Sequence, residues 1–291
     1  MRGRPCFARA AFFLRDKRAK IRYNLNGRFA RPPTDDRAKE RNDMAKKVLL
    51  AGESWSSYTT HVKGFDAFYT SVYEEGGKWL IEALKASGYE VDYLPNHKIP
   101  TEFPTTMEEL SAYACVILSD TGSNTLLLHP DTFAKSLRTP NRCQLIRDYV
   151  RAGGALLMVG GYMAFSGVDA KAKYGHTALA EVLPVACLEV DDLMEHPEGV
   201  YPAIVKDHPA LTNVPKNWPH FLGYNKTRAI PAGEVVMTIE GDPFLAFGDF
   251  GKGRSAAFTS DCAPHWGPPE FVDWEGYQPL WKGIVDYITR A

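Results

Sequence analysis

Residues 153–167 read GGALLMVGGYMAFSG, an apolar run between two glycine pairs. The run from Ala155 to Val159 has the length and character of a strand that is buried on both faces. Glycine directly after such a strand permits a tight turn that lifts one side chain above the sheet edge, as in a nucleophile elbow. Tyr162 or Met163 occupies that place. A glycine-rich strand end without a chemical role explains the same residues equally well.

Strand and helix patterns alternate around this stretch. Apolar runs predict strands at 47–51, 89–94 and 115–118, and helical spacing predicts helices at 77–87, 107–113, 142–151 and 280–288. Further strands at 235–239, 244–248 and 254–259, joined by glycine turns, predict an antiparallel extension that returns to the main sheet. This order predicts an α/β fold with a mainly parallel sheet, covered on both faces, and a β-rich insertion.

Composition narrows the class of protein. The chain has 291 residues, of which 45% are hydrophobic and 24% are charged, as in ordinary globular domains. No apolar run approaches the roughly 18 to 20 residues of a membrane span, so we expect a soluble protein without a membrane partner. Five cysteines at irregular spacing, without a CxxC pair, predict a reducing compartment and a cytoplasmic location.

Positive charge is concentrated at the start of the chain. Residues 1–43 carry 13 basic and 5 acidic residues, and the remainder carries 21 and 30. This segment could be a basic arm for nucleic acid or membrane, an organelle presequence, or the result of a start codon assigned too far upstream. We favour the last, because Met44 precedes a strand and Lys39-Glu40 can be encoded by AAGGAG, a ribosome-binding sequence. We therefore predict a disordered extension, 1–43, and one domain, 44–291, without a nucleic-acid partner for the domain.

Several separate short segments of the sequence resemble those of one known family. They are His61-Val62-Lys63-Gly64-Phe65-Asp66, Tyr174-Gly175-His176-Thr177, Ala180-Glu181-Val182-Leu183-Pro184-Val185 and Leu222-Gly223-Tyr224-Asn225. With the order of strands and the elbow, they resemble the family of "putative glutamine amidotransferases" over nearly all of residues 46–291. The resemblance implies a flavodoxin-like, three-layer class I glutamine amidotransferase fold.

The resemblance also implies a set of catalytic residues that this chain reproduces only in part. Class I amidotransferases use a cysteine at the elbow, a histidine after a late strand and a glutamate close behind it. Tyr162 stands near the elbow instead, with an ordinary pKa near 10, so conventional glutaminase activity is not expected. His265 keeps the histidine position, but Glu270 follows five residues later rather than two. Cys262 is expected to be structural.

Ligands of open α/β sheets bind outside the carboxyl ends of the strands, so the loops there supply the candidates. His265 stands four residues after Asp261 and could be an oriented general base, or a surface histidine in a proline-rich loop. We predict catalytic roles for His265, Tyr162 and Asp261. Small residues after the strand at 115–118 could let backbone amides face a ligand, although Asp120 could equally cap the next segment. The predicted ligand-binding residues are Glu53, Ser54, Asp120, Gly122 and Gly161.

The first loop, from Glu53 to Tyr69, mixes aromatic residues with hydroxyls. Such residues suit a small polar molecule such as a sugar, but also suit a sheet edge or a dimer contact. No phosphate-binding glycine motif is present, and no cofactor or metal is predicted. The acidic run Asp191–His196 could hold a metal, but a solvated loop is the favoured interpretation.

These observations support two classes of function. The first is an amidotransferase-like protein that binds or hydrolyses a small polar molecule at the strand ends, with His265 as a base. The second is a noncatalytic interaction module that assembles with itself or with a partner, and a relative in sugar metabolism is a third option. Whether the chain is an enzyme stays open at this point, and a homo-oligomer is expected.

Overall fold

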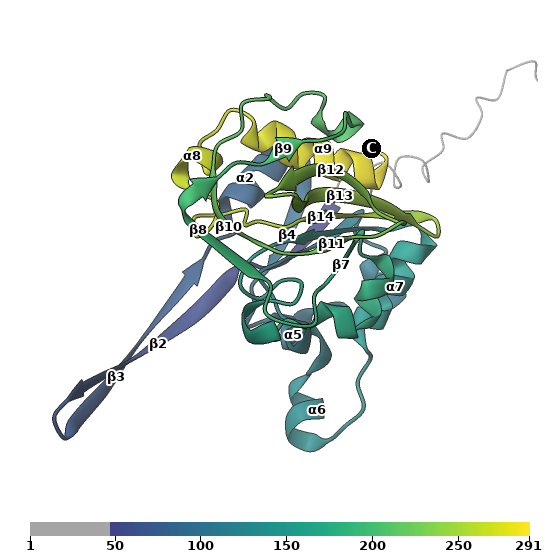
Figure 1. The fold of residues 1–291 in the computed structure, drawn as a ribbon. Coiled ribbons are helices and arrows are strands. Elements are labelled where there is room, and N and C mark those ends of the chain that lie inside the picture. The colour runs from purple at the N-terminus through teal and green to yellow at the C-terminus, as the bar shows by residue number, and fades with distance from the viewer. Residues whose placement is uncertain (1–46) are drawn as a thin grey trace, which may run out of the picture. The chain divides into compact units, whose positions relative to one another are not determined.

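The computed structural model describes residues 47–291, and the predicted extension at 1–43 lies outside the described residues. Eight strands form the main sheet in the order β4-β1-β5-β6-β14-β13-β12-β9 (Figure 1). In chain order they are β1 (Lys47–Gly52), β4 (Glu90–Leu94), β5 (Cys115–Ser119), β6 (Ala155–Val159), β9 (Ala203–Ile204), β12 (Glu234–Ile239), β13 (Asp242–Phe250) and β14 (Gly253–Phe258).

The sheet is parallel in one part and antiparallel in the other. β4, β1, β5, β6 and β14 pair in parallel, whereas β13, β12 and β9 add antiparallel strands. The register pairs Ala51 with Leu118, Leu118 with Met158, and Val159 with Phe258. The carboxyl ends of these strands therefore lie at one edge. The predicted α/β fold with a mainly parallel sheet, and the return of the last strand to it, are confirmed.

Helices cover both faces because side chains alternate along the buried strands. Val48 and Leu50 of β1 share one apolar cluster with Leu80 of α2 (Lys78–Ala86) and Trp281 of α9 (Tyr277–Thr289). Leu49 and Ala51 belong to the other cluster, which contains Ile146 of α7 (Arg142–Ala152). The shorter helices are α3 (Ile99–Glu102), α4 (Met107–Leu110), α5 (Ser123–Leu127), α6 (Pro130–Lys135) and α8 (Pro269–Val272).

Two small antiparallel sheets form the insertion. β8 (Leu193–Val200) pairs with β10 (Phe221–Asn225), and β7 (Val185–Ala186) pairs with β11 (Arg228–Ala229). Part of the run predicted as a solvated loop, Asp191–His196, is therefore strand. None of the helices in residues 47–291 combines the length and the apolar character that a bilayer crossing needs.

The segment predicted as a long first loop is a β-hairpin. β2 (Ser54–Lys63) and β3 (Asp66–Glu75) pair only with each other within the described part of the chain, and the hairpin projects from the domain (Figure 1). Gly64, with φ of 63°, stands first in the two-residue turn, as type II′ geometry requires. The loop interpretation was wrong. Neither strand buries a face in the core, so the sequence lacks the alternation of apolar and polar residues that predicts a strand. We call residues Ser54–Glu75 the arm.

Candidate functional site

The carboxyl ends of β1 and β5 each lead into an acidic residue with a left-handed backbone. Glu53 has φ of 51° and Asp120 has φ of 42°. This conformation is uncommon for residues other than glycine, and such strained positions cluster at functional sites. Because β1 and β5 are neighbours in the sheet, the two carboxyl groups interact electrostatically with each other.

Glu53 is a buried acid at the root of the arm. Its side chain is only 1% exposed, and Oε2 accepts a hydrogen bond of 2.5 Å from Oγ of Ser119. Its backbone N–H donates to the carbonyl of Ser119, and its own carbonyl accepts from Gly76 N–H and from the hydroxyl of Tyr93. Burial, followed by the charges of Asp261 and Asp120, raises the pKa of Glu53 well above 4.5. Burial therefore favours the protonated form of Glu53 over a wider pH range than in a free glutamate.

Asp120 lies closer to the surface and is half-buried. Its Oδ1 accepts a hydrogen bond of 2.7 Å from the backbone N–H of Met163, in the turn after β6. Burial and then the charge of Asp261 raise the pKa of Asp120 to about 6. Asn96 fixes the adjacent backbone, because its side-chain amide donates to the carbonyls of Ser54 and Asp120. Asp120 therefore changes its charge just below neutral pH.

His265 is held from two sides. Its Nδ1 lies 3.4 Å from Oδ2 of Asp261, and its ring stacks on Trp266 at 5.2 Å between centroids. Burial lowers the pKa of His265, but the hydrogen bond and charge of Asp261, with Asp120 and Glu195, outweigh it and raise the pKa above 6.5. The side chain is 40% exposed, so the imidazole is both oriented and open to a ligand.

Tyr162 completes the group from the turn after β6. Its ring meets the edge of His265 at 4.5 Å between centroids. Its hydroxyl donates to Oε1 of Glu195 at 2.8 Å, and Nε1 of Trp266 donates to Oε2 of the same carboxylate at 3.1 Å. The hydrogen bond to Glu195 raises the pKa of Tyr162 above 10, with burial adding to it. Tyr162 is therefore a neutral hydrogen-bonding group here and not a nucleophile.

The turn itself leaves no room for a nucleophile at Gly161. This residue has φ of 140°, and a Cβ atom there would lie 2.9 Å from Oδ1 of Asp120. The side chain of Asn225 accepts from Gly161 N–H at 2.9 Å and donates to the Gly161 carbonyl at 3.1 Å. The backbone of Gly161 is thus bound within the chain, which limits its use toward a ligand.

Cys262 lies in the interior beside the acidic residues. Its Sγ is 3.6 Å from Oγ of Ser119, and burial, with the charges of Glu53 and Asp261, raises its pKa well above 9. A reactive cysteine needs a stabilised thiolate, so this thiol is not equipped for nucleophilic catalysis. Oxygen and sulfur donors of Glu53, Asp261 and Cys262 lie within 4.8 Å of one another. Three donors fall short of the four of a structural zinc site.

The structure brings together most of the residues predicted from the sequence. Glu53, Asp120, Asp261, His265 and Tyr162 form one group, which we call the strand-end cluster. Ser54 lies at its margin with its hydroxyl bonded to Asn96 N–H, and a Cβ atom on Gly122 would lie 2.7 Å from Cε of Met163. Glu270 is exposed in α8. The partner of His265 is therefore Asp261.

Three polar residues that position the cluster were not selected from the sequence. They are Glu195, Asn225 and Asp192. Asp192 is buried and accepts from the N–H groups of Ser166 and Gly167, so the solvated-loop interpretation was wrong for it. The only signal was their place in the words Asp191–His196 and Leu222–Asn225, since their partners are distant in the sequence.

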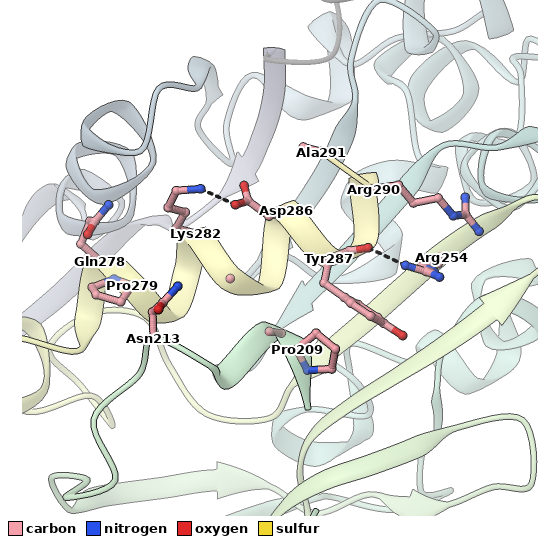
Figure 2. Close-up of a pocket in the computed structure, with 12 residues that line it drawn as sticks. Pro209, Asn213, Arg254, Gln278, Pro279, Lys282, Asp286, Tyr287, Arg290 and Ala291 are labelled. Carbon is pink, nitrogen blue, oxygen red and sulfur yellow. Dashed lines mark hydrogen bonds and ion pairs between the residues drawn. The ribbon is translucent and has the colours of Figure 1, made fainter. Parts of the chain in front are cut away.

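A cavity of about 530 Å³ lies elsewhere, between α9 and the 3₁₀ turn Pro209–Leu211 (Figure 2). Its charged groups are satisfied within the chain: Lys282 pairs with Asp286, and Arg254 donates to the carbonyl of Tyr287. Arg254 stands at the beginning of β14, whereas the strand-end cluster follows the end of that strand. The cavity and the cluster are therefore separate.

Comparison with known proteins identifies the family of this chain. Residues 47–290 match the family described as "Putative glutamine amidotransferase". Two solved structures, "Cytoplasmic Protein STM3548 from Salmonella typhimurium" and "Cytoplasmic Protein STM1381 from Salmonella typhimurium LT2", are each 45% identical to this chain with a TM-score of 0.81. Each comparison covers 83% of this chain, with 98% of the first protein and 99% of the second. No curated protein matches the chain. The turn after β6 carries no cysteine. Because the match extends over residues 47–290, the chain nevertheless belongs to this glutamine amidotransferase-like family.

Proposed function

We propose that the strand-end cluster binds a small polar molecule and hydrolyses it by general acid–base catalysis, without a cysteine intermediate. The observation that carries the proposal is the meeting of Asp120, Asp261 and His265 at the ends of β5 and β14, with the pKa values of Asp120 and His265 both raised. Perturbed acids and bases that converge at the carboxyl edge of a sheet are typical of catalytic sites. We also propose that the domain has the flavodoxin-like architecture of class I amidotransferases.

The order of the pKa values suggests how the roles divide. Asp120, with a pKa of about 6, is a carboxylate at neutral pH and can take a proton from water as that water attacks the substrate. His265, with a pKa above 6.5, can carry a proton and give it to the leaving group. In this assignment Asp120 is the base and His265 the acid, whereas the sequence alone suggested His265 as the base. Asp261 stabilises the imidazolium, and Glu53 is a buried neighbour whose protonated form is favoured by burial.

A screen on the full chain tests the proposal. Small amides, amino acids and sugars would be added singly in a thermal-shift assay, and each stabilising compound would be followed by NMR for hydrolysis. We expect His265→Ala and Asp120→Asn to lower turnover by roughly 10²- to 10⁴-fold. Glu270→Gln is the matched control and should leave turnover unchanged, because Glu270 is exposed outside the cluster. If His265→Ala and Asp120→Asn both bind and turn over a compound as the natural chain does, the strand-end cluster is not the catalytic site.

The arm favours a second function, assembly without catalysis. The arm projects from the domain (Figure 1), and its large aromatic side chains are exposed rather than buried in the core. Assembly and hydrolysis are compatible, since the arm projects from the domain and its first residue, Ser54, directly follows Glu53 of the strand-end cluster. Failure of the ligand screen would leave the assembly role standing.

A further inference from the structure

The arm exposes aromatic residues on both of its faces. Directly opposed residues of a hairpin share a face, and the register pairs Ser56 with Tyr73, Thr60 with Tyr69, and His61 with Phe68. Consequently one face carries Tyr58, Val62, Tyr69 and Tyr73, and the other carries Trp55, His61, Phe68 and Val72. A hairpin with one solvated face would alternate apolar and polar residues. Neither face of the arm therefore has the composition of an ordinary solvated sheet face.

The arm as a whole exposes a large aromatic area, which is divided between its two faces and the turn. Phe65 at the turn is fully exposed, Tyr58 is 82% exposed and Tyr69 is 76% exposed. Together the six exposed aromatic residues of the arm equal about four fully exposed side chains, or roughly 600 to 1,000 Å². For comparison, a stable interface uses about 800 Å² from each partner.

Within residues 47–291, the outer backbone edges of β2 and β3 also lack a strand partner. Ten-residue strands span roughly 33 Å, and two-stranded sheets are only marginally stable alone. Exposed edge strands usually carry prolines or charges that prevent pairing with other chains. β2 has no proline or acidic residue, and its single Lys or Arg is Lys63 at the far end. β3 carries Asp66, Glu74 and Glu75. The edge of β2 is therefore the one open to pairing.

We propose that the arm joins two copies of this chain, with the outer edges of β2 paired antiparallel around a two-fold axis at Thr59. Two β2 edges can meet without opposing acidic groups, whereas two β3 edges would bring the acidic ends of the strands together. The resulting four-stranded sheet meets the requirement of three or more strands for stability. With the axis at Thr59, Trp55 faces Lys63 of the second copy, an aromatic and cationic pair that attract each other.

This pairing also brings the arm of one copy to the site of the other. Antiparallel overlap places the turn with Phe65 beside the root of the second arm, where Ser54 follows the buried Glu53. The aromatic turn would then cover the margin of the second strand-end cluster and restrict access of water. The proposal concerns assembly and does not depend on whether the cluster is catalytic.

Sedimentation of the full chain at micromolar concentration provides the test. We expect a dimer for the natural sequence and a monomer for Thr59→Glu, with an apparent Kd raised at least roughly 100-fold, because two carboxylates would face each other across the axis. Thr70→Glu is the matched control, because Thr70 lies directly opposite Thr59 on β3 and is exposed as Thr59 is. It should keep the dimer, as should Phe133→Glu, which changes an exposed aromatic residue outside the arm.

A mixing experiment makes the test specific for the two-fold axis. Thr59→Lys should also be monomeric, and mixing it with Thr59→Glu should restore dimers, because opposite charges then meet at the axis. Circular dichroism of each variant would show that the domain remains folded. A monomeric natural chain would overturn the proposal. A dimer that survives Thr59→Glu, equal dissociation by Thr59→Glu and Thr70→Glu, or no recovery on mixing would also overturn it.

Discussion

Nδ1 of His265 lies 3.4 Å from Oδ2 of Asp261, four residues earlier in the loop after β14. The buried carboxylate orients a half-exposed imidazole and raises its pKa above 6.5 against the opposing effect of burial. This pair gives the strand-end cluster a group that can hold or release a proton near neutral pH.

Replacing Asp261 with Asn should lower the pKa of His265, because burial would remain while the main stabilising charge is lost. NMR titration of the His265 ring protons measures this directly. Since the folded pKa is raised, the pair stabilises the fold below pH 6.5, and that contribution disappears as the pH rises through the folded value. His265→Gln should therefore cost a few tenths to about 1 kcal/mol at pH 5.5 and less at pH 8.5. An identical loss at both pH values would contradict the ion pair.

Asp120→Asn should stabilise the protein at pH 7 to 8 by about 1 to 3 kcal/mol, since each pKa unit corresponds to about 1.4 kcal/mol. Its folded pKa of about 6 is above the ordinary 3.8, so ionisation costs stability progressively as the pH rises between these values. Urea unfolding at pH 4 and pH 7.5 measures the effect, which should be small at pH 4. Asp131→Asn is the control of opposite sign, because Lys135 lowers the pKa of Asp131. No gain for Asp120→Asn at pH 7.5 would show that the carboxylate is better solvated than its surroundings indicate.

Purified protein should not release ammonia from glutamine at a useful rate. Gly161 offers no side chain at the strained turn, and the thiol of Cys262 is buried with a pKa well above 9. In the folded protein, Cys262 should also resist iodoacetamide until denaturant is added. Glutamine-dependent ammonia release that Cys262→Ala abolishes would identify that thiol as a nucleophile after all.

A chain that begins at Met44 should melt within about 2 °C of the full chain. The family match begins at residue 47, and the basic residues before it show no helical or strand period. For a domain of this size about 1 kcal/mol shifts Tm by roughly 2 to 4 °C, so calorimetry resolves a loss of that magnitude. A decrease of several degrees would mean that residues 1–43 contribute to the fold.

The sequence by itself determined the main sheet and placed several residues of the strand-end cluster at one edge of it. Apolar runs such as Ala155–Val159 are too uniform for a surface strand, and the return of Gly253–Phe258 to the sheet follows from short turns between strands. Because parallel strands end at one edge, His265, Asp261, Asp120 and Glu53 could be assigned to the same edge from their positions alone.

Only the tertiary structure decided what these groups can do. The raised pKa values of Glu53, Asp120 and Cys262 depend on burial and on charges contributed by separate segments, which no local pattern encodes. Glu195 joins Tyr162 and Trp266 only after β8 is folded over the sheet edge. The arm could not be predicted as strands from the sequence. Its strands bury almost nothing in their own domain, so the alternation of apolar and polar residues that identifies a strand is absent.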